Sequence, residues 1–89
     1  MAWSIEYDRL VRKQVEKLDP QIQQRIHSFL YQRLAKLDNP RQLGEAMHGS
    51  EFGKFWRYKV GDYRIICDIQ DQRVVVLVVE VGHRREVYR

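Results

Sequence analysis

Residues 54–89 have the sequence KFWRYKVGDYRIICDIQDQRVVVLVVEVGHRREVYR, and this stretch decides the fold. Within it, Val60-Gly61-Asp62-Tyr63 is a two-residue hairpin signal, with glycine at the first central position as a type II′ turn requires. Asp71-Gln72 is a weaker turn signal ahead of a valine-rich run. The stretch therefore predicts a three-strand antiparallel meander, followed by a basic and aromatic tail.

The predicted hairpin sorts its side chains onto two faces. A turn at residues 61–62 places Lys59 opposite Arg64, with Arg57 on the same face, and we call these three residues the basic face. The other face carries the residues that we expect helices to cover: Trp56, Tyr58, Val60, Tyr63, Ile65, Cys67 and Ile69. Like charges opposite each other destabilise a sheet, so the Lys59–Arg64 pair predicts that an anion binds there.

A turn at residues 71–72 also sorts the third strand. It predicts Val74, Val76 and Val78 on the helix-covered face, and it places four residues beside the cations: Val75, Leu77, Val79 and Val81. Such an apolar strip marks an interaction surface unless the tail folds back over it, and both interpretations stay open. We expect Gly82 to break or bulge the strand and to turn the tail toward the basic face.

The first half of the chain predicts one strand and two helices. Residues 3–7 alternate apolar and polar side chains, as a half-buried strand does. Asp8 is expected to cap a first helix, and Asp19-Pro20 to start a second one that ends before Pro40. Residues 41–53 predict a connector with one helical turn. The predicted fold is a single α+β domain over residues 1–89, with an N-terminal strand, a helix hairpin and the meander, and with the helices packed on one face of the sheet.

Composition restricts the class of protein. Cys67 is the single cysteine, so we expect no internal disulfide, no metal site and no cofactor. The sequence has no secretory signal and no apolar run of membrane-spanning length, which predicts a soluble cytoplasmic protein without a membrane partner. The net charge is +4, and residues 54–89 hold eight Lys and Arg against five Asp and Glu. This balance favours RNA, DNA or an acidic protein as the partner, and charge alone does not separate them.

Two motifs carry a resemblance to a known family: WRYKVGDYRII at residues 56–66 and VGHRREVY at residues 81–88. Over nearly its whole length the chain resembles the RelE branch of the RelE/ParE toxin superfamily. The resemblance implies a type II toxin, a ribosome-dependent endoribonuclease that cleaves mRNA in the A site of the 30S subunit, beside the 16S rRNA, and inhibits translation. It also implies a RelB-like antitoxin that neutralises the toxin and binds operator DNA, so that the toxin meets DNA only through the antitoxin.

The same resemblance assigns roles to residues of the sheet and the tail. Arg57 and Lys59 match a pair of strand cations that members often carry as two lysines, and Arg64 matches an arginine that contacts the phosphate. Arg84 matches the arginine that protonates the leaving group, and Tyr88 matches the tyrosine that stacks on the A-site nucleotide. These five are the expected catalytic residues. The residues expected to bind substrate are Arg85, His83, His48 and Lys54.

This chemistry uses a 2′-hydroxyl of the RNA, which attacks the adjacent phosphate and leaves a cyclic phosphate. The protein must then supply a base, an acid and positive charge, and no metal. Lys59 is the preferred base, because like-charge repulsion from Arg57 and Arg64 favours its neutral form. The two arginines suit phosphate oxygens. Arg84 holds its proton too firmly for a good acid, so its main expected role is electrostatic.

Several alternatives stay open. In one of them, Arg57 and Lys59 are ordinary exposed strand cations. In another, Arg64 pairs with Asp62 or Asp68. The main functional alternative is a ParE-like DNA gyrase inhibitor, which acts by binding a protein and needs no catalytic cluster. A simple nucleic-acid-binding module is a further alternative, in which loss of a cation weakens binding broadly.

Overall fold

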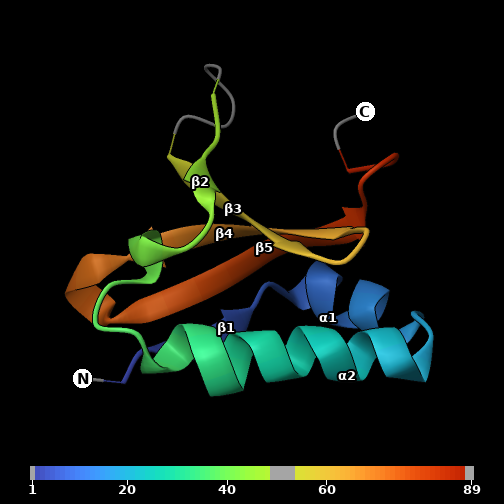
Figure 1. The fold of residues 1–89 in the computed structure, drawn as a ribbon, viewed down its shortest axis with the longest axis horizontal. Helices are drawn as coiled ribbons and strands as arrows, with labels where there is room; N and C mark the ends of the chain where they lie inside the picture. Colours follow the sequence, from blue (N-terminus) through green and yellow to red (C-terminus); the bar gives the residue numbers. More distant parts are fainter. Residues whose placement is uncertain (1, 49–53, 88–89) are drawn as a thin grey trace.

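The computed structural model describes residues 2–48 and 54–87, and Figure 1 shows their arrangement. The first half contains β1 (Ser4–Tyr7), α1 (Arg9–Glu16), α2 (Pro20–Ser28), a π-helical segment (Phe29–Arg33) and a 3-10 turn (Leu34–Lys36). The rest contains a 3-10 turn (Pro40–Gln42), β2 (Glu45–Ala46), β3 (Phe55–Val60), β4 (Tyr63–Gln70), a 3-10 turn (Asp71–Arg73) and β5 (Val75–His83). In these ranges no helix is long and apolar enough to span a membrane.

The strands form one mixed sheet in the order β1-β5-β4-β3-β2. β1 lies parallel to β5 at one edge, and the other neighbours are antiparallel. Helices α1 and α2 lie together on one face of the sheet (Figure 1). The predicted α+β fold is confirmed, with its N-terminal strand, helix hairpin and three-strand meander. The sequence pattern does not predict β2, because a two-residue strand has no periodicity.

Both helices begin where the sequence predicts. The Asp8 carboxylate accepts a hydrogen bond from the Leu10 amide at 3.0 Å, and the Asp19 carboxylate accepts one from the Gln21 amide at 2.8 Å. Each bond satisfies an amide that the first helical turn leaves unpaired. The helical path after α2 ends at Leu37, whose backbone is extended.

The main core lies between the helices and the sheet. The helical half of the chain contributes Val11, Ile26, Leu30 and Leu34, and the sheet contributes Tyr58, Ile65, Cys67, Val76, Val78 and Val81. The Tyr58 hydroxyl donates a hydrogen bond to Pro40 O at 2.6 Å, and burial raises the pKa of this phenol. The bond satisfies a buried polar group and ties β3 to the connector that follows the helices.

The register of the first hairpin matches the prediction. Lys59 pairs with Arg64 across the β3–β4 ladder, and Val60 pairs with Tyr63 beside the turn. Gly61 has a φ of +58°, and among the described residues Val74 is the one non-glycine with positive φ, so Asp62 is not left-handed. This combination fits a type II′ turn, which needs positive φ only at its first central residue.

The second turn is wider than predicted. It passes through the 3-10 turn and then Val74, which is left-handed at a φ of 54°. Gln70 pairs with Val75, so four residues rather than two connect β4 to β5. The predicted place of Val74 in the strand is therefore wrong, whereas Val76 and Val78 lie in the main core as predicted. A β-branched residue rarely adopts this conformation, so no local pattern indicates it.

A β-bulge changes which face the end of β5 presents. Ile66 pairs with Glu80, whereas the next residue, Cys67, pairs with Val78, so Val79 is the extra residue. The bulge reverses the alternation beyond it. Val81 consequently lies in the main core, and its predicted place beside the cations is wrong.

A smaller apolar cluster lies on the face away from the helices. Met47, Ile66 and Val87 are buried together, with Phe55 and Val79 packed against them. Val87 belongs to the tail, so the tail folds back over the apolar strip at Val79. Cover by the chain itself therefore holds at this position, and both interpretations stay open for Leu77.

Candidate functional site

The basic face is built from two neighbouring strands. β3 supplies Arg57 and Lys59, and β4 supplies Arg64, which lies directly opposite Lys59 one residue pair from the hairpin turn. Lys59 is exposed, and Arg64 is half-buried. Two cations that the backbone holds opposite each other repel, and a bound anion relieves that repulsion. The register therefore places the two cations as the predicted anion site requires.

Arg64 is tied to the hairpin turn. Its Nη1 donates hydrogen bonds to Gly61 O at 3.1 Å and to Tyr63 O at 3.0 Å. Among the residues that the structure describes, Arg64 forms no ion pair with Asp62 or Asp68, the two carboxylates considered as its partners. The turn thus orients the guanidinium through one nitrogen, and the planar group has five N–H donors in all.

The tail after β5 is bound to the same turn. The Arg84 amide donates a hydrogen bond to Asp62 O at 2.8 Å, and Arg84 Nε lies 3.8 Å from Asp62 Oδ1. Gly82 pairs with Arg64 in the β4–β5 ladder, so the tail begins at the end of the sheet that holds the Lys59–Arg64 pair. The described part of the tail therefore lies with Arg84 at this end of the sheet. The expected break or bulge at Gly82 is wrong, because β5 continues to His83 and its bulge lies at Val79.

Two of the predicted substrate-binding residues lie in this tail. The His83 ring is edge-on to the Tyr63 ring, with 5.7 Å between centroids. His83 Nδ1 accepts a hydrogen bond from the Arg85 amide at 3.2 Å, and the Arg85 side chain is exposed. Tyr88, the residue predicted to stack on the base, lies outside the described residues. The structure thus places His83 and Arg85 beside Arg84, at the turn end of the sheet.

The other two predicted substrate-binding residues lie farther away. His48 and Lys54 are exposed on either side of residues 49–53. Lys54 precedes β3, and Lys59 lies five positions further on, about 17 Å away along an extended strand. Lys54 Nζ lies 5.3 Å from the centroid of the Phe55 ring. The structure therefore does not bring Lys54 to the Lys59–Arg64 pair.

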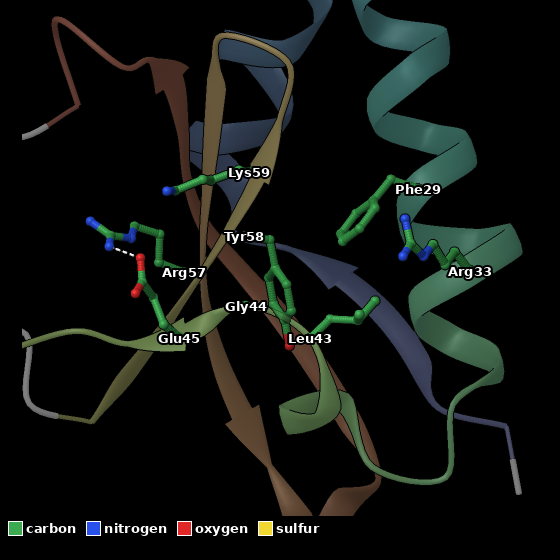
Figure 2. A pocket seen from close by; sticks show the side chains of 8 residues that line it. All are labelled: Phe29, Arg33, Leu43, Gly44, Glu45, Arg57, Tyr58 and Lys59. Atoms are coloured by element: carbon green, nitrogen blue, oxygen red, sulfur yellow. Dashed lines mark hydrogen bonds and ion pairs between the residues drawn. The ribbon is translucent and has the colours of Figure 1, made fainter.

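A carboxylate that the sequence pattern does not indicate joins the basic face. Glu45 of β2 pairs with Arg57 across the β2–β3 ladder, and their side chains form an ion pair (Figure 2). The Arg57 side chain is 28% exposed and that of Glu45 is 51% exposed. Glu45 lies in a connector with three glycines and no periodicity, so no local signal places it beside Arg57.

A cavity of about 310 Å³ lies beside this ion pair (Figure 2). Its lining combines three cations, one carboxylate and apolar surface: Phe29, Arg33, Leu43, Gly44, Glu45, Arg57, Tyr58 and Lys59. Figure 2 shows the Arg57 and Lys59 side chains on one side of β3 and the Phe29 and Arg33 side chains on the helical side. Arg33 is a cation that sequence reasoning does not associate with the site. The two rings pack in the main core and Tyr58 is only 1% exposed, so the cations are the groups that this cavity offers to a nucleic acid.

Neither a metal-binding cluster nor the cysteine belongs to the basic face in the part of the chain that the structure describes. The described residues contain no group of three or more His, Cys, Asp or Glu side chains that could hold a metal ion. Cys67 is buried in the main core, and burial raises the pKa of its thiol. Because the thiolate is the reactive form of cysteine, Cys67 is a structural residue. The groups on the basic face are cations and hydrogen-bond donors, which bind and polarise a phosphate.

The sequence model of one protein family, described as the ParE toxin of type II toxin-antitoxin systems, matches residues 5–88. The chain belongs to the RelE/ParE superfamily of type II toxins. The match includes the basic face and the tail as far as Tyr88.

The toxin is similar to Toxin RelG of Mycobacterium tuberculosis, with 26% identity over 89 residues that cover all of this chain and 99% of that protein. Its structure is similar to the RelBE2 toxin–antitoxin complex of M. tuberculosis, with a TM-score of 0.84 and 21% identity over 97% of this chain and 95% of that chain. The structure is also similar to the isolated RelE toxin of E. coli, with a TM-score of 0.72 and 23% identity over 98% of this chain and 92% of that chain. For the RelE–RelB complex of Pyrococcus horikoshii the TM-score is 0.74 and the identity is 21%, over 98% of this chain and 100% of that chain.

These structural likenesses, all below 25% identity, establish the fold. The matched family model is named for ParE, whereas the similar curated protein is named RelG and the similar structures above are RelE toxins or RelB–RelE-type complexes. Membership of the superfamily therefore does not by itself choose between their activities, and the choice depends on the residues of the site.

Proposed function

We propose that the toxin is an endoribonuclease that cleaves mRNA in the ribosomal A site and so inhibits translation. The observation that carries the proposal is the Lys59–Arg64 pair at the hairpin, with Arg84 bound to the same turn through Asp62. Cations gathered at one end of a sheet suit an RNA phosphate and the charge that develops on it. The similarity to Toxin RelG and to RelE structures supports the same choice.

The reaction uses the 2′-hydroxyl of the RNA as the nucleophile. Lys59 takes the proton of this hydroxyl, and the oxygen attacks the adjacent phosphorus. The bond from phosphorus to the 5′-oxygen of the next nucleotide breaks, and a 2′,3′-cyclic phosphate remains. Arg57 and Arg64 stabilise the negative charge on the phosphoryl oxygens. The RNA supplies the nucleophile, and side chains of the toxin supply the base and the positive charge. The proposed reaction therefore uses no metal ion or cofactor.

Arg84 acts on the leaving oxygen. A guanidinium keeps its proton in proteins, so Arg84 stabilises the developing alkoxide while water supplies the proton. Tyr88 provides a ring for the A-site base, a stacking interaction worth about 1–3 kcal/mol. His83 and Arg85 contact the RNA beside the cut, and His48 and Lys54 contact it farther along the strand.

The proposed partners are the A site of the 30S subunit, with its 16S rRNA and mRNA, and a RelB-like antitoxin. The antitoxin is suggested by two of the similar structures, which are toxin–antitoxin complexes. We expect the antitoxin to neutralise the toxin and to connect it to operator DNA. Both partners place the toxin in the cytoplasm.

Inhibition of DNA gyrase is the second candidate function. It is favoured by the family model, which is named for the ParE toxin. A toxin that acts by binding a protein does not need two cations held opposite each other, so the Lys59–Arg64 pair has no role in this candidate. The ribonuclease accounts for that pair and is preferred for this reason.

The test follows mRNA and DNA in parallel. Wild-type toxin is added to translating ribosomes, and primer extension should reveal discrete cuts in A-site codons. Arg84→Ala should remove most of the cutting. The matched control is Arg73→Ala, which removes an exposed arginine from a surface ion pair with Glu6 and should leave cutting unchanged. Intact mRNA together with gyrase-dependent DNA breaks would overturn the ribonuclease, and unchanged cutting by Arg84→Ala would overturn the role of Arg84.

A further inference from the structure

The path of the backbone holds Glu45 against Arg57. β2 places the two residues directly opposite each other in the ladder, where side chains on one face are neighbours. The preceding residue, Gly44, has a φ of +72° and lies so close to β3 that a Cβ atom there would overlap the Arg57 carbonyl oxygen. Glycine alone combines this conformation with this approach. The ion pair is therefore built into the turn that leads into β2.

The Glu45 carboxylate offers Arg57 the same recognition as a phosphate. Either anion presents oxygens to the planar guanidinium fork. A donor that is bonded to Glu45 is not available to RNA, and the carboxylate repels an approaching phosphate. Arg57 and Glu45 line the same cavity as Lys59, so this competition takes place within the basic face (Figure 2).

We propose that Glu45 weakens the binding of free RNA by neutralising Arg57, and that mRNA held by the ribosome displaces it. The inference rests on the proposed function, because it concerns the same RNA site. A strand that the ribosome already holds in place loses little further freedom when it binds, so it competes with an internal carboxylate better than a free strand does. Glu45 therefore favours ribosome-bound mRNA over free RNA as the substrate.

The test measures RNA binding without cleavage. Fluorescence anisotropy follows a single-stranded RNA whose 2′-hydroxyls are methylated, over a range of salt concentrations. Glu45→Gln should tighten binding by roughly twofold to fivefold, the worth of an exposed ion pair. Because Glu45 then no longer neutralises Arg57, the slope of log K against log salt should steepen, by at most about 0.7. Glu45→Ala should shift both quantities in the same direction, so the result does not depend on one variant.

A matched control separates this effect from net charge. Glu6→Gln makes the same charge change in the ion pair with Arg73, on β1 and away from the basic face, and it should leave the slope unchanged. In an Arg57→Gln background, Glu45→Gln should no longer steepen the slope. Equal effects of Glu45→Gln and Glu6→Gln, or an effect that persists without Arg57, would overturn the inference. Cutting of ribosome-bound mRNA by the wild type is scored separately, and its absence would sink the proposed function instead.

Discussion

Lys59 and Arg64 face each other across the hairpin, but their surroundings differ. Arg64 is half-buried and held by two carbonyl groups of the turn, whereas Lys59 is exposed. A planar guanidinium held in one orientation is pre-organised for a phosphate, whereas a lysine has a flexible stem and accepts a proton only as the neutral amine. The surroundings of Arg64 support its proposed role in holding charge, whereas the role of Lys59 as the base stays a proposal.

Replacing Arg64 should slow cleavage more than it weakens binding. Arg64→Ala removes a positioned donor from the phosphate, and loss of such a donor costs about 100-fold to 1,000-fold in kcat. Arg64→Lys keeps the charge but loses the fork that bonds the turn, so it should recover only part of the rate. Single-turnover cleavage of ribosome-bound mRNA measures both variants. A wild-type rate for Arg64→Lys would contradict the role of the guanidinium.

At the scale of residues, the sequence predicts the cations better than their partners. Lys59 opposite Arg64 follows from a two-residue turn, because such a turn determines the pairing on both sides of it. The partner of Arg57 lies 12 positions earlier in the chain, in a connector without periodicity, and is therefore invisible to local patterns. The place of Tyr88 stays a prediction, because this residue lies outside the described ranges.

At the scale of elements, β2 depends on the glycine before it. Gly44→Ala would place a Cβ against the Arg57 carbonyl and 2.8 Å from Tyr58 Cδ1, at a φ of +72°. Strain of this kind costs about 1–3 kcal/mol, and we expect the free energy of unfolding to fall by that amount in chemical denaturation.

Gly82→Ala is the control for this prediction. Its Cβ would lie 3.6 Å from Val87, an ordinary contact. Replacing a glycine inside a strand by alanine typically changes stability by less than about 1 kcal/mol, and in the favourable direction. Equal destabilisation by the two substitutions would show that Gly44 has no special role.

The half-buried carboxyl of Glu80 gives the stability of the fold a dependence on pH. Glu80 lies at the bulge in β5, opposite Ile66, and burial raises the pKa of its carboxyl. Because its pKa is higher in the folded state, the carboxyl favours folding when it is protonated, below its unfolded pKa of about 4.3. This contribution to stability is lost as the pH rises through the pKa of the folded state. Glu80→Gln stays neutral, so it should raise the melting temperature at pH 7 and change it less at pH 4. Thermal unfolding at the two pH values checks this, and a larger gain at pH 4 would contradict it.

The elements that the sequence predicts are those with a local signal. Asp8 and Asp19 mark the helix starts, and Gly61 marks the first hairpin. The wide second turn and the bulge at Val79 have no such signal, because a left-handed valine and an extra strand residue are set by packing of the whole strand. The wrong predictions for Val74 and Val81 have this common cause.

At the scale of the whole molecule, the helices cover one face of the sheet (Figure 1). The alternation of side chains along β3 and β4 places the basic face on the other side. The fold class and the superfamily are predictable from the sequence, because two motifs lie in the meander and the tail. The pairing of β1 beside β5 is not, since it joins strands some 70 positions apart and no local pattern specifies it.

Cleavage by the 2′-hydroxyl of ribosome-bound mRNA is the central claim, and one substitution in the RNA tests it directly. An mRNA with a single 2′-deoxynucleotide on the 5′ side of the mapped cut is placed on ribosomes and treated with wild-type toxin. We expect no cut at that position, while the all-RNA control is cut and ends in a 2′,3′-cyclic phosphate. Cleavage of the deoxy-substituted mRNA at the same position would contradict the mechanism.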